Sequence, residues 1–169
     1  YILHVDTLPL VSLLFAGAWL VAVIGLADDL QSAPAYQRAL IHLMAALWVS
    51  VNVWGFPHDL MTGIFVLLGC LTVAWSINLY NFMDGIDGIA ASETLFICAA
   101  VSCLLLLSGD TTWIWVLMLL CSTVAAFLVW NWSPARIFMG DVGSGFLGYV
   151  LSTVALITIK EDLVPLSCW

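Results

Sequence analysis

Six long apolar runs constrain the fold of this 169-residue chain more than any other feature of its sequence. Each run has about the 17–25 residues that an α-helix needs to cross a bilayer, and its apolar residues are continuous rather than alternating. Such runs predict helices, because in lipid only helices and closed barrels satisfy every backbone polar group. The expected spans are 8–27, 39–56, 60–79, 88–107, 111–130 and 142–159.

The overall composition agrees with a membrane protein. With 64% hydrophobic and 8% charged residues, the chain has too little polar surface for a soluble domain. We therefore expect an all-α, polytopic integral membrane protein with a single membrane domain over residues 1–169. A net charge of −8 argues against nucleic acid as a partner. Because the sequence starts at Tyr1 without a methionine and ends abruptly at Trp169, we expect a fragment of a longer chain.

Three acidic clusters stand at the ends of apolar runs. Asp28–Asp29 follow the first run, Asp84 and Asp87 follow the third, and Asp141 follows the fifth. Two crossings separate each cluster from the next, so all three are expected on one membrane face. That face also carries two of the three basic residues, which favours the cytoplasm. Carboxylates at a membrane edge are costly and are usually kept for function.

The segment Asn78–Gly88 reads N-L-Y-N-F-M-D-G-I-D-G and closes the third run. Asn78, Asn81 and Asp84 are spaced three apart, so they form one polar stripe on a helix. Asp87 would face the other way on a continuous helix, and we expect the neighbouring glycines to bend the chain and return it to the site. A plain polar helix end is the alternative, but this density of carboxamides and carboxylates favours function.

The segment 131–145 reads N-W-S-P-A-R-I-F-M-G-D-V-G-S-G and joins the fifth and sixth runs. Pro134 is expected to end the incoming helix, and Ser144 is a candidate cap for the next one. A helix N-terminus offers free N–H groups to an anion, and Asp141 beside it suits a magnesium-bridged phosphate. A plain helix–turn–helix with glycine packing is the alternative. Because several acids on one face repel one another without a divalent cation, the residues predict a magnesium-dependent site for a phosphate or diphosphate.

These two motifs, together with the Asp28–Asp29 pair, resemble the polyprenyl-phosphate N-acetylhexosamine-1-phosphate transferase superfamily, glycosyltransferase family 4. The wording of the motifs is nearest to the O-antigen-initiating branch. The resemblance implies that undecaprenyl phosphate attacks the β-phosphate of a UDP-N-acetylsugar and that UMP leaves, with Mg²⁺ as cofactor and Mn²⁺ as an alternative. It implies a multi-pass protein of the bacterial inner membrane, with its site on the cytoplasmic face, membrane lipid as a partner and a homodimer as one option.

The resemblance also implies roles for individual residues. Asp141 matches the metal-binding aspartate, and Asp28 and Asp29 match the pair at the lipid-phosphate end. Asp84 and Asp87 match catalytic positions on the nucleotide-sugar and metal side. The implied substrate-binding residues are Asn78, Asn81, Asn131, Arg136, Phe138, Gly143 and Ser144, of which Asn131 and Phe138 would contact uracil. The family's N-terminal spans and its downstream histidine loop are not among these 169 residues, which adds to the expectation of a fragment.

The chemistry of the nucleophile limits the role of the aspartate pair. A phosphate monoester has a second pKa near 6, so the nucleophile is already mostly ionised at neutral pH and a general base adds little. We therefore expect Asp28 or Asp29 to act through positioning.

Two other functions fit part of the pattern. An intramembrane aspartyl protease would use Asp84 and Asp141 as a proton-sharing pair, but it leaves the Asp28–Asp29 pair and the asparagine stripe unexplained. An ion-coupled transporter would place acids beside broken helices, but near the middle of the membrane rather than at its edge. His42 is expected to be an ordinary residue of its span.

Overall fold

The computed structural model describes residues 8–32, 34–109 and 111–169. Every expected span is a helix: α1 (Leu8–Gln31), α2 (Ala35–Trp54), α3 (Leu60–Met83), α4 (Ile89–Ser108), α5 (Thr112–Asn131) and α6 (Gly140–Lys160). A short 3-10 turn, η2 (Leu166–Cys168), follows, and these described ranges hold no strand. The prediction of an all-α, polytopic membrane protein is confirmed.

One helix differs from the others in composition. By length and apolar character, α1, α3, α4, α5 and α6 qualify as membrane spans, whereas α2 does not. The helix α2 carries Gln37, Arg38, His42 and Asn52 along an otherwise apolar sequence. The polar residues near its start belong to the end of the bundle where the acidic clusters lie.

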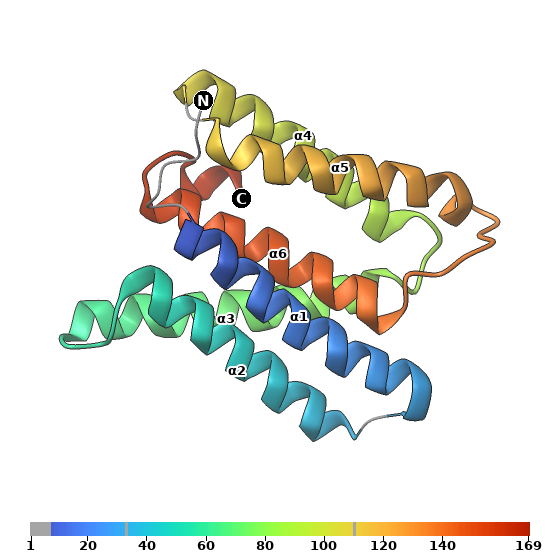
Figure 1. The fold of residues 1–169 in the computed structure, drawn as a ribbon, viewed down its shortest axis with the longest axis horizontal. Coiled ribbons are helices and arrows are strands. Elements are labelled where there is room, and N and C mark those ends of the chain that lie inside the picture. The colour runs from blue at the N-terminus through green and yellow to red at the C-terminus, as the bar shows by residue number, and fades with distance from the viewer. Residues whose placement is uncertain (1–7, 33, 110) are drawn as a thin grey trace.

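The helix α6 forms the centre of the bundle (Figure 1). It is buried at nearly every position from Ser144 to Thr158. The helices α1, α2 and α3 pack around it, and α4 and α5 pair as a hairpin on its other side. Lipid tails are as apolar as the side chains, so helices in a membrane associate through close packing, which small residues allow.

Gly148 lies at a tight contact between α6 and α3. A Cβ atom at this position would lie 2.6 Å from the Ser76 carbonyl oxygen and 2.7 Å from the Ile77 Cα atom. Both are backbone atoms, which cannot rotate away. The absence of a side chain at Gly148 therefore sets the distance between these two helices.

We expect Gly148→Ala to destabilise the bundle by about 1–3 kcal/mol, the usual cost of overpacking a core. The matched control is Gly63→Ala in α3, where the added methyl would meet only the Pro57 side chain, at 3.8 Å. Thermal unfolding in detergent should show a lower midpoint for Gly148→Ala and little change for Gly63→Ala. Equal midpoints for the two variants would show that the α3–α6 contact is not as tight as described.

All three acid-bearing connections lie at one end of the bundle, on the right in Figure 1. They are the α1–α2, α3–α4 and α5–α6 connections, as the count of crossings predicts. The helices reach further into this end than expected. Asp28 and Asp29 lie in the last turns of α1, and Asp141 lies in the first turn of α6.

Candidate active site at one end of the bundle

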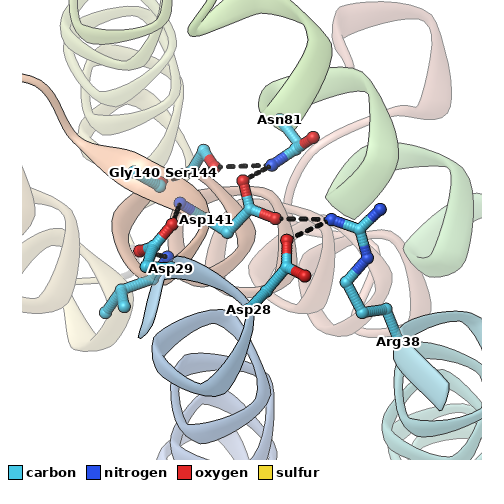
Figure 2. Close-up of polar contacts among 8 residues, drawn as sticks. Asp28, Asp29, Arg38, Asn81, Gly140, Asp141 and Ser144 are labelled. Atoms are coloured by element: carbon cyan, nitrogen blue, oxygen red, sulfur yellow. Dashed lines mark hydrogen bonds and ion pairs between the residues drawn. The ribbon is translucent and has the colours of Figure 1, made fainter. Parts of the chain in front are cut away.

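Asp141, in α6, lies where this helix meets α1, α2 and α3 (Figure 2). Its carboxylate accepts hydrogen bonds from Asn81 Nδ2 of α3 at 2.5 Å and from Arg38 Nη1 of α2 at 2.8 Å. The same Arg38 nitrogen also pairs with the Asp28 carboxylate of α1. Residues from α1, α2, α3 and α6 therefore form one connected polar cluster.

Asp29 contacts the backbone at the start of α6 rather than the side chains of this cluster. Its Oδ1 atom accepts a hydrogen bond from the Asp141 N–H at 3.1 Å, and its Oδ2 atom accepts one from the Val142 N–H at 3.4 Å. The expectation that Ser144 caps this helix is wrong, because Ser144 lies inside α6 and its Oγ donates to the Gly140 carbonyl at 2.8 Å. Two of the first-turn N–H groups of α6 that were expected to face an anion, those of Asp141 and Val142, are therefore held by Asp29.

Ser144 has a second contact. Asn81 Nδ2 also reaches Ser144 Oγ, at 3.4 Å, so Ser144 lies beside the carboxylate that Asn81 orients.

Asp84 ends α3 and lies close to the cluster. Burial is the main cause that raises the pKa of Asp84 to about 6. A hydrogen bond with the Gly140 backbone, the next largest effect, lowers it, and the negative charges of Asp141 and Asp29 add smaller increases. A carboxyl group with a pKa this close to neutral pH gains or loses its proton with modest changes in its surroundings.

Asp87 and Asn131 hold the α5–α6 loop in place. Asp87 Oδ2 accepts from the Ala135 N–H at 3.0 Å. Asn131 is only 3% exposed, accepts from the Gly88 N–H and donates to the Ile137 carbonyl, both at 3.0 Å. The chain does turn at Gly88, where φ is +75°, but the Asp87 carboxylate is directed to the loop backbone rather than to Asp141. A uracil contact for Asn131 stays a prediction.

The other residues implied as substrate contacts lie around this end. Phe138 is 70% exposed in the α5–α6 loop. The Arg136 guanidinium lies 5.9 Å from the centre of the Trp130 ring. Gly143 is inside α6, where the Met139 side chain fills the space that a Cβ atom would need. Their contacts with substrate stay predictions.

A cavity of about 280 Å³ opens beside Asp141. Its lining includes Arg38, His42, Asn78 and Asn81. Asn78 donates to the Ala74 carbonyl one turn earlier in α3, and His42 Nδ1 is buried without a hydrogen-bond partner in the described part of the chain. The asparagine stripe therefore lines one cavity with Asp141, as its spacing suggested.

Two of these cavity residues were missed by reasoning from sequence. Arg38 was counted only as a charge on this face, and His42 was taken as an ordinary span residue. The signal was present, because Arg38 and His42 are four residues apart on α2 and so share one face.

A second cavity, of about 560 Å³, borders the other side of the α3–α4 connection. Asp87, Glu93, Phe96 and Trp132 are among its lining residues. It combines carboxylates with aromatic side chains, whereas the cavity beside Asp141 combines a carboxylate with amides and a guanidinium.

The donor atoms around Asp141 fit a magnesium ion whose remaining ligands would come from a substrate. Within residues 8–32, 34–109 and 111–169, His, Cys, Asp and Glu form no group of three that could hold a metal by themselves. Mg²⁺ usually binds through one or two carboxylates, waters and substrate phosphates. Asp141 and Asp28 supply two carboxylates, and the Arg38 guanidinium lies between them where their charges require a cation.

The fold and the site define a multi-pass membrane protein with a carboxylate-rich site at one end of its helices. Residues 11–159 match the family model described as glycosyl transferase family 4, and the chain belongs to this family. The resemblance inferred from the motifs is confirmed, and family membership leaves the protease and transporter alternatives without support.

The chain is also similar to curated proteins with two different transferase names. The chain is 30% identical over 160 residues to a "Probable undecaprenyl-phosphate N-acetylglucosaminyl 1-phosphate transferase" of Bacillus subtilis, covering 89% of this chain and 45% of the relative. It is 36% identical over 127 residues to the phospho-N-acetylmuramoyl-pentapeptide-transferase of Moorella thermoacetica, covering 72% of this chain and 40% of that protein. The enzyme of the same name from Thermotoga neapolitana is 34% identical over 164 residues, covering 88% and 53%. The chain thus spans about half the length of these relatives.

Proposed function

We propose that this chain forms the catalytic centre of an enzyme that transfers an N-acetylhexosamine 1-phosphate from a UDP-sugar to undecaprenyl phosphate and releases UMP. The observation that carries the proposal is the convergence of Asp28, Arg38 and Asp141 from three helices of a family 4 chain. Such a cluster suits phosphate groups, because it offers both carboxylates for a bridging metal and a guanidinium for direct contact.

The reaction needs little proton transfer. An oxygen of the lipid phosphate attacks the β-phosphorus, the bond from that phosphorus to the α–β bridging oxygen breaks, and UMP leaves with that oxygen. Since the nucleophile is mostly ionised at neutral pH, positioning and charge neutralisation provide most of the rate. When bound, Mg²⁺ neutralises charge on the diphosphate. Asn81 fixes the orientation of the Asp141 carboxylate, and Arg38 supplies a positive charge beside it.

The two cavities support a substrate with two parts. The polar cavity beside Asp141 is large enough for phosphate groups, at about 280 Å³. The cavity of about 560 Å³ beside Asp87 carries the aromatic side chains Phe96 and Trp132, which suit the faces of a ring. We assign the diphosphate to the first cavity and a ring of the UDP-sugar to the second. The exposed Phe138 ring is assigned to a contact with uracil.

The site is proposed to lie at the cytoplasmic face of a bacterial inner membrane. Arg38 and Arg136 are at the end of the bundle that carries the site, and Lys160 closes α6 at the opposite end. This distribution follows the positive-inside tendency. A site at the cytoplasmic face would also be open to water-soluble UDP-sugars, and the lipid acceptor would reach the site from the membrane.

The identity of the sugar in the donor is the most specific part of the proposal. The name of the Bacillus subtilis relative supports N-acetylglucosamine, and the names of the Moorella thermoacetica and Thermotoga neapolitana relatives support N-acetylmuramoyl-pentapeptide. The motif wording favours O-antigen initiation. The test is UMP release by the whole protein in detergent, with undecaprenyl phosphate and a panel of UDP-N-acetylsugars, in Mg²⁺ and in EDTA. Lipid-dependent release with one donor would support the proposal, and a folded protein inactive with every donor would contradict it.

Metal affinity in the proposed site is expected to fall as the pH drops through about 6. The raised pKa of Asp84 means that its protonated form accumulates below about pH 6, and a proton must then leave before a cation binds. Apparent affinity should be constant well above pH 6 and decrease by up to about tenfold per pH unit below it. Mn²⁺ titration by EPR between pH 5 and 8 measures this, and Asp84→Asn should remove the bend. An affinity that stays constant from pH 8 down to pH 5 would show that Asp84 is not involved, because an ordinary carboxyl group titrates near pH 4.

A further inference from the structure

The adjacent residues Asp28 and Asp29 have different partners. Asp28 pairs with the Arg38 side chain. Asp29 instead accepts the N–H groups of Asp141 and Val142, so it binds the backbone of another helix. The first N–H groups of a helix have no partner inside it, and a carboxylate is well suited to them because it also favours the positive end of the helix dipole.

The backbone around Asp29 is shaped for this contact. Gly140 opens α6 with φ at +66°, and a Cβ atom there would lie 2.7 Å from Asp29 Oδ2. On α1, one turn before Asp29, a Cβ atom at Gly25 would lie 2.6 Å from the Asp141 carbonyl oxygen and 2.7 Å from the Val142 nitrogen. The glycines on both helices therefore allow the first turn of α6 to pack directly against the end of α1.

We propose that Asp29 is a positioning residue that caps α6 from α1 and thereby sets the direction of the Asp141 carboxylate. The inference rests on the proposed function for its kinetic consequence, but the cap itself does not depend on it. Only Asp28 of the pair then faces the cluster around Arg38 through its side chain. Asp28 therefore contributes its charge to the cluster, and Asp29 places the first turn of α6.

A capping role and a general-base role for Asp29 predict different effects of substitutions at position 29. Asn is as good a helix cap as Asp, and Ala is a poor one. A carboxamide at position 29 has one acceptor oxygen, so it can keep the Asp141 N–H bond at 3.1 Å and loses only the longer contact with the Val142 N–H group. It cannot take up a proton at neutral pH. Asp29→Asn should therefore preserve most of the geometry, whereas Asp29→Ala should lose it. Asp29 is exposed at the end of α1, so neither change removes a buried group.

Gly25→Ala tests the same contact without touching any functional side chain. The added methyl would collide with the backbone of Asp141 and Val142 and push the first turn of α6 away from α1. Gly63→Ala adds the same methyl at a position with no close neighbour and serves as its control. If Asp29 acts by placement, Gly25→Ala reproduces the defect of Asp29→Ala.

The experiment measures Mn²⁺ affinity by EPR, thermal midpoint and the pH profile of kcat for the whole protein carrying each variant. We expect Asp29→Asn to keep Mn²⁺ affinity within about threefold and to keep the shape of the pH profile. Asp29→Ala and Gly25→Ala should each weaken Mn²⁺ binding by about fivefold or more, the fold-change expected for losing one cap.

Two results would overturn the inference. One is that Asp29→Asn matches Asp29→Ala and loses the acid limb of its pH profile, because that identifies a proton acceptor. The other is that Gly25→Ala binds Mn²⁺ like Gly63→Ala. If Gly25→Ala does not fold, the comparison of Asp29→Asn with Asp29→Ala still tests whether Asp29 acts as a cap. If the unmodified protein releases no UMP, the proposed function fails while Mn²⁺ affinity and thermal midpoint still report on the cap.

Discussion

Asp141→Asn is expected to lower kcat/KM for UMP release by about 10²- to 10³-fold, the range found when one main electrostatic contact to a transition state is removed. The side chain keeps its shape but loses the charge that a bridging metal requires. It also leaves the Arg38 guanidinium with Asp28 as its carboxylate partner. The measurement is kcat/KM together with Mn²⁺ affinity, and both should fall.

Asp59→Asn is the control for loss of one negative charge. Asp59 caps α3 at the opposite end of the bundle, where its carboxylate accepts from the Thr62 N–H at 2.7 Å. Asn preserves that cap, so the fold should be unaffected. Comparable activity of the Asp141→Asn and Asp59→Asn proteins would show that Asp141 is not the centre of the site.

Arg38→Ala is expected to separate metal binding from turnover. Without the guanidinium, the Asp28 and Asp141 carboxylates lose their shared cation, so free Mn²⁺ should bind more tightly. Turnover should nevertheless fall by about 10²-fold, because the substrate phosphates lose a charged hydrogen-bond donor. Arg38→Lys should recover part of kcat/KM, since Lys restores the charge but not the planar fork.

The control for this pair of effects is Arg136→Ala. It removes a positive charge from the same end of the bundle, but Arg136 packs on the Trp130 ring rather than on the carboxylates. Its Mn²⁺ affinity should therefore stay close to that of the unmodified protein. A Mn²⁺ affinity that falls in Arg38→Ala would contradict the arrangement in which Arg38 occupies the place of a cation.

The helices and their shared end follow from the sequence alone, because the span length and the number of crossings are local properties. The polar stripe of Asn78 and Asn81 was likewise readable, since a helix repeats every 3.6 residues. The helix ends were less accurate. The sequence pattern ends the first span at Ala27, whereas α1 continues to Gln31 and so places Asp28 and Asp29 on the helix.

The partners of the polar residues were beyond the sequence pattern, because they come from helices far apart in the chain. Ser144 follows Gly143 in a position that suits a cap, yet the cap is Asp29, more than a hundred residues earlier. Arg38 is on α2, which does not qualify as a membrane span by its composition, and the fold was needed to show that Arg38 reaches Asp141. Asp87 was matched to a catalytic position and Asn131 to uracil, and both stay predictions. The backbone contacts that these side chains make, with Ala135 and with Gly88 and Ile137, could not be read from the sequence.

The measurement that tests the proposed activity most directly follows each phosphorus of the donor. The whole protein in detergent is supplied with undecaprenyl phosphate and a UDP-N-acetylsugar labelled separately at its α- and β-phosphorus. We expect the β-label to enter the lipid fraction with the sugar and the α-label to leave as UMP, only when the lipid and Mg²⁺ are present. Release of UDP carrying both labels would show transfer of the sugar without its phosphate, and would contradict a sugar-1-phosphate transferase.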